Sequence, residues 1–411
     1  MLIEFRVKNY CCLRDEQVLS LVPSSDTSLL ESNTYETGVP SVPRLLRTAV
    51  IYGPNAGGKS TVLRAFQTML SMVIFSADLE TKGKFLPVPF LLDDASHDEP
   101  TAFEISFLHN NKRYQYGFSC QSKQIFEEYL LEYNSSRPKT IFQRLYDSTL
   151  DKDVYTFSRA LRGPKNVWRD ATQKNVLFLS RAAQLNSEQL SPILEKNFAS
   201  AFVFNRHLRP SLHVFLQHIY ENKSIKQHIC QLIKAADINI KDIDIQEKHQ
   251  EHNNDGNIIE KKYRLSFIHA TEYGDISLPA GIESEGTMRL LYYLIPLLDA
   301  LNLGCVLAID ELDASLHPLL VRRVVEMFQS PKTNPKGAQL IFTTHDTSLL
   351  QDMETLFRRD QVWFVEKNED QASELYSLAE FKTQKGEDFS LAYLRGLYGG
   401  IPLLRSWEAE Q

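Results

Sequence analysis

The chain has 411 residues, 43% of them hydrophobic and 24% charged, which is the composition of an ordinary soluble globular protein with two or three domains. A formal net charge of −7 excludes a protein whose bulk charge recruits nucleic acid, although 45 Lys and Arg residues suffice for a local basic face. Five cysteines without C-x-x-C spacing, no signal-peptide pattern and no run near ~20 apolar residues favour a cytoplasmic protein that does not enter a membrane.

The first 50 residues predict two strands and a loop. Apolar side chains run through 2–7 and 18–22, with a turn at Arg14-Asp15 between them. Residues 23–45 are rich in Ser, Thr, Asn and Pro, so we expect a long loop there.

A phosphate-binding loop follows. The apolar run 50–52 leads into a glycine-rich stretch, and a helical pattern starts directly after it. Glycines let backbone N–H groups close around phosphates, and the helix N-terminus adds the positive end of its dipole. We expect Lys59 to reach the β- and γ-phosphates of ATP and the Ser60 hydroxyl to hold Mg²⁺. The predicted ATP-binding residues are Gly53, Pro54, Asn55, Ala56, Gly57, Gly58, Lys59, Ser60 and Thr61.

The middle of the chain predicts an antiparallel meander and then helices. Apolar residues alternate over 102–134, with a hairpin turn at Asn110-Asn111, and the meander continues through 141–146. From 168 to 236 the apolar spacing becomes helical without a sustained heptad, which favours a compact helical insertion over a coiled coil. Its histidines are expected to be partly exposed helical side chains rather than metal ligands.

A hairpin turn is predicted over 253–256 and a strand over 258–268. A long amphipathic helix then runs from near Gly286 to Gly304, with Pro296 expected to bend it. The helix begins at Ser284-Glu285-Gly286-Thr287, which taken alone is also explained as a helix cap.

Two further buried strands predict the second half of the nucleotide site. The run 305–309 ends in Asp310 and Glu311, the Walker B pattern. Asp310 is expected to hold Mg²⁺ through water beside Ser60, and Glu311 to polarise the attacking water, because one carboxylate cannot do both. The run 339–343 ends near His345, which we expect to contact the γ-phosphate or the water, because ligands bind at the carboxyl ends of parallel strands. A satisfied core histidine is the alternative.

The order of these motifs is similar to that of the ABC/SMC class of ATPases. The resemblance implies an α/β fold, an ABC/SMC-type P-loop ATPase with a parallel core sheet, an antiparallel β meander and a helical insertion. It also implies a homodimer or higher homo-oligomer, in which the signature loop of one subunit caps the ATP held by another. Ser284, Glu285, Gly286 and Thr287 match that loop at its Ser and its second Gly, with Glu285 in place of the first Gly. Asp313 and Ser315 match the D-loop; Gln115, Gln121 and Gln143 all stay candidates for the Q-loop glutamine.

Nearly the whole chain resembles, more narrowly, the RloA-type ATPases of bacterial antiviral defence cassettes. The resemblance implies a separate effector, an RloB-like protein or another nuclease or toxin, with nucleic acid reached through the complex. It divides the chain into an N-terminal ATPase lobe (1–165), a helical insertion (166–240) and a C-terminal ATPase lobe (241–411). The residues that carry it are 52–56, 235–238, 284–287, 310–313, 315–318, 358–364 and 398–402.

Three functions compete at this stage. The leading one is an ATPase that serves as sensor or regulatory scaffold for the effector. The second is a RecF-like DNA-repair ATPase that clamps DNA, and the third is a nucleotide-gated binding module with almost no turnover. A transporter ATPase is disfavoured because the full signature sequence and a clear Q-loop are missing.

Overall fold

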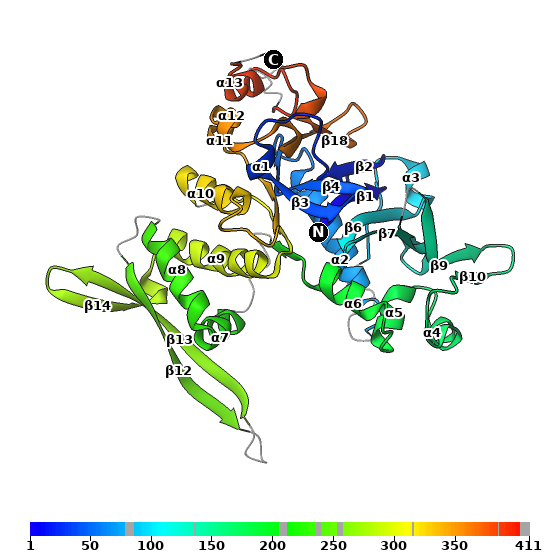
Figure 1. Cartoon of the computed structure of the whole chain (residues 1–411), viewed down its shortest axis with the longest axis horizontal. Coiled ribbons are helices and arrows are strands. Elements are labelled where there is room, and N and C mark those ends of the chain that lie inside the picture. Colours follow the sequence, from blue (N-terminus) through cyan, green and yellow to red (C-terminus); the bar gives the residue numbers. More distant parts are fainter. Residues whose placement is uncertain are drawn as a thin grey trace, which may run out of the picture.

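The computed structural model describes residues 1–78, 86–134, 137–204, 212–235, 240–252, 258–314, 316–384 and 386–402. Figure 1 shows a body of sheets and helices, and an arm of long strands that projects away from it. The predicted α/β fold with a parallel core sheet and an antiparallel meander is confirmed by the strand order of the two large sheets.

The core sheet has the strand order β11-β15-β16-β5-β17-β18, and its neighbouring strands are parallel except at the β17–β18 edge. Its strands are β5 (Thr48–Tyr52), β11 (Phe202–Phe204), β15 (Val306–Ile309), β16 (Gln339–Thr343), β17 (Val362–Lys367) and β18 (Ser373–Ser377). Every residue of β5, β15 and β16 is buried, as expected for parallel strands covered on both faces. Their carboxyl ends therefore meet at one edge of the sheet.

The second large sheet is antiparallel, with the order β10-β9-β8-β7-β6-β1-β2. Its strands are β1 (Leu2–Lys8), β2 (Gln17–Ser20), β6 (Thr101–His109), β7 (Lys112–Gln121), β8 (Gln124–Tyr133), β9 (Pro138–Asp147) and β10 (Lys152–Phe157). The predicted meander and its Asn110-Asn111 turn are confirmed, and both turn residues have positive φ. Strand β10 extends the meander beyond the prediction.

Helix α2 joins the two sheets, because its apolar face belongs to the same hydrophobic cluster as residues of both. Phe66 of α2 packs edge-on against Phe5 of β1 at 5.2 Å between ring centroids. The opposite face of the core sheet is covered by a second cluster that includes α9 and α10. The helices of the body are α1 (Leu30–Asn33), α2 (Lys59–Phe75), α3 (Asp94–Asp98), α4 (Lys165–Ala171), α5 (Phe178–Gln184), α6 (Ser191–Leu194), α9 (Glu285–Leu303), α10 (Pro318–Gln329), α11 (Ser348–Gln351), α12 (Met353–Leu356) and α13 (Phe389–Leu394).

The prediction of a loop over 23–45 is wrong. The segment contains α1 and the hairpin of β3 (Thr34–Val39) and β4 (Val42–Leu46). Val42 and Leu45 of the hairpin bury a small cluster with Ile3 of β1. These few apolar residues outweigh the many turn-forming ones, because a two-stranded ribbon needs only one apolar face.

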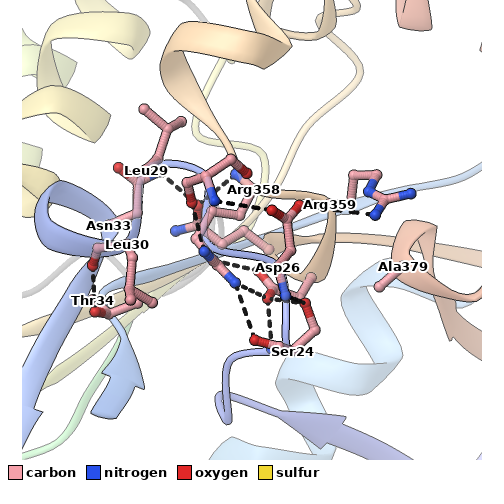
Figure 2. Close-up of polar contacts among 12 residues, drawn as sticks. Ser24, Asp26, Leu29, Leu30, Asn33, Thr34, Arg358, Arg359 and Ala379 are labelled. Carbon is pink, nitrogen blue, oxygen red and sulfur yellow. Dashed lines mark hydrogen bonds and ion pairs between the residues drawn. The ribbon is translucent and has the colours of Figure 1, made fainter. Parts of the chain in front are cut away.

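A buried arginine holds this N-terminal segment against the core sheet (Figure 2). The guanidinium of Arg358 donates to both carboxylate oxygens of Asp360, at 2.6 and 3.0 Å, and to the carbonyl oxygen of Ser28 at 2.5 Å. Asp360 in turn accepts from the backbone N–H and hydroxyl of Ser24. Asn33 donates to the side chain of Gln361 at 2.7 Å. Residues 358–361, which contributed to the family resemblance, therefore have a structural role here.

The predicted helical segment 168–236 is interrupted. Strand β11 lies inside it and pairs with β15 of the core sheet. The part before β11 holds α4 to α6 and the π-turn η1 (Glu195–Ala199), which packs with the meander. The part after it holds α7 (Leu212–Glu221) and α8 (Lys223–Ala235). The apolar run of β11 is only three residues long, and a run this short does not distinguish a buried strand from part of a helix.

The arm is the three-stranded antiparallel sheet β12 (Ile240–His252), β13 (Ile258–Thr271) and β14 (Gly274–Pro279), with α7 and α8 against it. The predicted strand over 258–268 is confirmed as part of β13. The predicted turn 253–256 lies outside the described residues. A short 3₁₀ turn, η2 (Ala280–Ile282), leads from the arm into α9, which ends at Gly304 with φ +71° as predicted.

Among the described residues, no helix is long and apolar enough to cross a bilayer, and no group of three or more His, Cys, Asp and Glu residues could hold a metal ion. His218 of α7 contacts Asp299 at 3.0 Å. His207 of the predicted helical histidines lies outside the described part of the chain.

Candidate nucleotide site

The phosphate-binding loop connects β5 to α2 and is shaped by close backbone packing. A Cβ on Gly53 would clash with the carbonyl oxygen of Val365 on β17. Gly58 precedes α2 with φ +119°, and a Cβ there would lie 2.6 Å from Ser373 Oγ. Asn55 and Ala56 at the tip are exposed. The loop thus presents backbone rather than side chains, as an anion-binding loop requires.

Lys59 lies in this loop in the position that the sequence predicts. Its Nζ donates to the carbonyl oxygens of Gly53 at 2.8 Å and Pro54 at 3.1 Å. Burial lowers the pKa of Lys59 to about 8, although the carboxylates of Asp310, Glu311 and Asp313 act in the opposite direction. Burial therefore disfavours the ammonium form of Lys59, and a bound polyphosphate would stabilise its charge.

Asp310 forms hydrogen bonds with three other segments of the chain. One of its oxygens, Oδ1, accepts from the Ser60 hydroxyl at 3.0 Å and from the Thr343 hydroxyl at 2.7 Å. Its backbone N–H donates to the carbonyl of Phe204 on β11 at 3.0 Å. The structure thus brings together Ser60 and Asp310, the two predicted magnesium ligands. Hydroxyl and carboxylate oxygens are the donors that Mg²⁺ prefers, so these residues fit the ion.

Thr343 belongs to the same hydrogen-bond cluster, although the sequence analysis did not predict it. Besides contacting Asp310, its Oγ1 accepts from the backbone N–H of Glu311 at 2.7 Å. It is fully buried at the end of β16. A single threonine at the end of a strand has no distinctive spacing, so the local sequence does not mark it.

Glu311 follows Asp310 with φ +54°, a backbone conformation that costs a non-glycine residue of order 1 kcal/mol. Such strain persists only where the surroundings hold it, and here the bond from Glu311 N–H to Thr343 and the bond from Leu312 N–H to the Thr343 carbonyl do so. The strained turn directs the chain away from β15 immediately after the strand ends. Strain of this kind is typical of functional positions.

His345 lies beyond the end of β16, at the edge of the sheet where the phosphate loop starts. Its backbone N–H donates to Asp313 Oδ2 at 3.2 Å. The residue is exposed, so it is not a core histidine. Partial desolvation of the ring and the nearby charge of Lys59 lower the pKa of His345, which keeps the imidazole neutral at pH 7. The buried Oδ1 of Asp313 has no hydrogen-bond partner among the described residues.

The predicted signature loop forms the N-terminus of α9. Ser284 Oγ accepts from the backbone N–H of Thr287 at 3.0 Å, so the capping interpretation is correct within one chain. Ser284 and Glu285 are exposed, so this helix start also remains accessible to a ligand. Arg289, one turn later, donates to the carbonyl of Ala314 in the predicted D-loop at 3.3 Å. Ser315 lies outside the described residues.

The three candidate Q-loop glutamines lie in the antiparallel sheet and bond locally. Gln115 accepts from the Tyr133 hydroxyl, Gln121 donates to the carbonyl of Asp98, and Gln143 donates to Glu127. Within the described residues, none of these bonds reaches the phosphate loop. Two residues that do support the loop were not predicted: Ser373, whose hydroxyl donates to the Gly57 carbonyl at 2.7 Å, and Tyr393, whose ring packs 5.6 Å from Tyr52.

Comparison with known proteins gives a matching family and a related solved structure. Residues 49–351 match the family model described as "AAA domain, putative AbiEii toxin, Type IV TA system". No curated protein sequence matches the chain. Among solved structures, the SMC head domain from Thermotoga maritima is similar over 92% of this chain and 98% of that chain, with 12% identity and a TM-score of 0.44.

Proposed function

The chain belongs to the family described as "AAA domain, putative AbiEii toxin, Type IV TA system", and from this premise we propose that it is an ABC/SMC-like ATPase that dimerises around ATP and regulates a separate effector. The observation that carries the proposal is the convergence of Ser60, Thr343 and the Glu311 backbone around Asp310, beside the buried Lys59. This arrangement places a cation-binding carboxylate, a phosphate-binding ammonium and a second carboxylate at one edge of the core sheet.

The residues of the site divide the work of hydrolysis. Lys59 would exchange the carbonyls of Gly53 and Pro54 for phosphate oxygens, and Ser60 and Asp310 would hold Mg²⁺. When bound, the ion neutralises charge on the phosphates. Glu311 accepts a proton from the attacking water as general base, and the neutral His345 hydrogen-bonds to the water or the γ-phosphate.

In the dimer, each chain completes the nucleotide site of the other with a segment that it exposes on its own surface. The exposed start of α9, with Ser284 at its N-terminus, offers a hydroxyl and the positive end of a helix dipole to a γ-phosphate held by a second copy. ATP favours the closed dimer because it makes more contacts with that state than with the open one. When hydrolysis removes the γ-phosphate, these contacts are lost and the dimer reopens. In this proposal the D-loop residues Asp313 and Ser315, which lie in sequence between Walker B and α10, contribute to the same interface.

The regulatory role follows the family resemblance of residues 52–56, 284–287 and 358–364 to RloA-type ATPases of antiviral defence. In this proposal the lobes 1–165 and 241–411 form the motor, and the insertion 166–240 with the segment 358–411 contacts an RloB-like or other effector in the cytoplasm. The chain by itself hydrolyses ATP and leaves DNA and RNA intact. Metal-dependent cleavage by the pure protein would contradict this division of labour.

A mixing experiment tests the shared site. Lys59→Ala removes the phosphate contact of one subunit, and Ser284→Arg blocks the loop it offers to the other. Each variant alone should be inactive, whereas a one-to-one mixture should regain about a quarter of the wild-type ATPase rate, because half the dimers are mixed and each has one intact site. A mixture as inactive as its components would show that the site is not shared between subunits.

A further inference from the structure

A groove of about 880 Å³ lies between α8 and the start of β12 in the arm, apart from the nucleotide site. Helix α8 buries Ile225, Ile229 and Ile233 on one face and leaves the opposite face to solvent. Four of the ten residues that line the groove are lysines and one is an aspartate. In a chain with a net charge of −7, this is a local concentration of positive charge.

The lysines are arranged to act together. Lys223, Lys226 and Lys234 stand at positions i, i+3 and i+11 of α8, so they share one side of the helix over roughly 16 Å. Lys226 is 3.9 Å from the carboxylate of Asp242, whose Oδ1 also accepts from the Cys230 thiol at 3.0 Å. Within the described part of the chain, Lys223 and Lys234 have no ion-pair partner. The groove therefore carries uncompensated charge.

Lys241 extends the basic surface from α8 onto β12. Its ammonium lies 2.6 Å from Asp275 on the neighbouring hairpin, and more than half of its side chain is exposed. An exposed pair of this kind contributes little and exchanges readily for another anion.

An aromatic side chain stands at the same groove. Tyr220, at the end of α7, lines it and is 45% exposed. Its ring packs against Tyr263 of β13 at 5.2 Å between centroids, which fixes its position. A positively charged groove with a supported, exposed ring is the combination that binds single-stranded nucleic acid, since lysines hold phosphates and the ring stacks on an unpaired base.

We propose that this groove binds single-stranded nucleic acid, with Lys223, Lys226, Lys234 and Lys241 on the phosphates and Tyr220 stacked on a base. An acidic protein surface would use the lysines but not the aromatic ring, and a duplex would hide its base faces. The proposal needs no nucleotide turnover, so it stands or falls separately from the proposed ATPase function.

The first measurement is the binding of fluorescein-labelled oligothymidylate and oligouridylate to the whole chain, by fluorescence anisotropy without ATP. With about four phosphate contacts, affinity should fall about 50-fold between 50 and 200 mM salt. Comparable affinity for both probes assigns the site to the shared phosphate and base chemistry. Binding of only one probe assigns it to DNA or to RNA. Salt-independent binding, or no binding at 50 mM salt, overturns the proposal.

Variants then locate the site. The double variant Lys223→Glu, Lys234→Glu should lose at least ~10-fold in affinity and roughly half of the salt dependence. The control Lys123→Glu, Lys332→Glu makes the same charge change at two exposed lysines outside the groove and should bind within about twofold of wild type. Equal losses in the two double variants would mean that binding is only a bulk-charge effect, which contradicts the proposal.

The aromatic contact separates nucleic acid from an acidic protein. Tyr220→Leu should weaken binding at least ~5-fold, whereas Tyr220→Phe should keep it, because only the first removes the stacking surface. Poly-glutamate is the competing probe. If poly-glutamate binds in a lysine-dependent manner more tightly than the oligonucleotides, or if Tyr220→Leu leaves oligonucleotide binding unchanged, the groove is a site for acidic protein and the proposal is wrong.

Discussion

Four elements of the chain meet at Asp310, whereas parts of the arm bury little of their surface. At the nucleotide site, α2, β11, β15 and β16 each contribute a hydrogen bond or a chain segment, and β15 and β16 are completely buried. In the arm, β14 has no buried residue, and α8 carries its lysines beside a narrow isoleucine stripe.

Because of this difference in burial, we expect the two regions to respond differently to substitution. A side chain changed at the nucleotide site disturbs several elements at once, so its effect should appear in nucleotide affinity or turnover. A side chain changed on the open face of the arm has few neighbours, so its effect should be confined to what the arm binds. Each experiment below tests whether the effects of substitution differ between the two regions in this way.

The largest effect is expected for Glu311→Gln. The amide cannot accept the proton of the attacking water, so kcat should fall about 10²–10³-fold while ATP binding persists. Because uncleaved ATP keeps the dimer closed, the variant should also accumulate as a larger species in light scattering with ATP. The arm variant Lys223→Glu is the matched control and should leave kcat unaffected. Unchanged turnover in Glu311→Gln would remove Glu311 from the mechanism.

Lys59 should give the site a pH dependence of about tenfold. With a pKa of about 8 in the empty loop, Lys59 is mostly charged at pH 7 and mostly neutral at pH 9. If only the ammonium binds phosphate, the Kd for ATP should rise about tenfold over this range, with proton uptake on binding above pH 8. The stability of the protein without nucleotide should change in the opposite sense to its affinity for ATP. The unfolded chain keeps the Lys59 proton up to pH about 10.5, whereas the folded chain loses it near pH 8, so the free energy of unfolding should rise as the pH is raised from 8.

Lys59→Arg is the control for this titration, because a guanidinium stays charged throughout. Its affinity for ATP should be constant between pH 7 and 9 when measured by equilibrium binding of a fluorescent ATP analogue. A flat profile in the wild type, or an equally steep one in the arginine variant, would assign the pH effect to another group.

The same contrast explains what could be predicted from the sequence. The phosphate loop, the Walker B strand and the long helix α9 combine a local motif with a strong apolar pattern, and the structure has them where the residues indicate. Strand β11 was not predicted because the partner that makes it a strand is distant: β15 lies about a hundred residues later. Pairing of this kind leaves little trace in the local sequence. The β3–β4 hairpin pairs locally and was missed because its few apolar residues stand among many turn-forming ones.

Site residues followed the same rule. Ser60 and Asp310 were predicted as partners because each belongs to a recognisable motif, the phosphate-binding loop and the Walker B strand. Thr343 and Ser373 were missed because each acts through one hydroxyl on a neighbouring segment, and a single Ser or Thr has no distinctive spacing. The groove at α8 was missed since it joins side chains of α7, α8 and β12, and no linear pattern unites them.

Glu311→Gly probes the strain at the site. Glycine adopts φ +54° freely, so the substitution should stabilise the folded protein by about 1 kcal/mol while abolishing hydrolysis. Thermal unfolding without nucleotide measures the gain. The companion variant Glu311→Gln keeps the strain and should unfold at the wild-type temperature. A lower unfolding temperature for the glycine variant would show that the Glu311 side chain contributes more to folding than its backbone strain costs.

The smallest effect tests a contact between the arm and the start of α9. His269 of β13 lies 2.5 Å from the carboxylate of Glu283, which directly precedes Ser284, so an arm strand holds the start of α9. His269→Ala should loosen that helix start by about 1 kcal/mol, seen as roughly fivefold faster hydrogen exchange of the amides over 285–288. Lys241→Ala, which breaks an arm ion pair remote from this turn in sequence, is the control and should leave those amides unchanged. If His269→Ala also leaves them unchanged, this contact does not hold the start of α9, and the groove on α8 has no route to the signature loop through it.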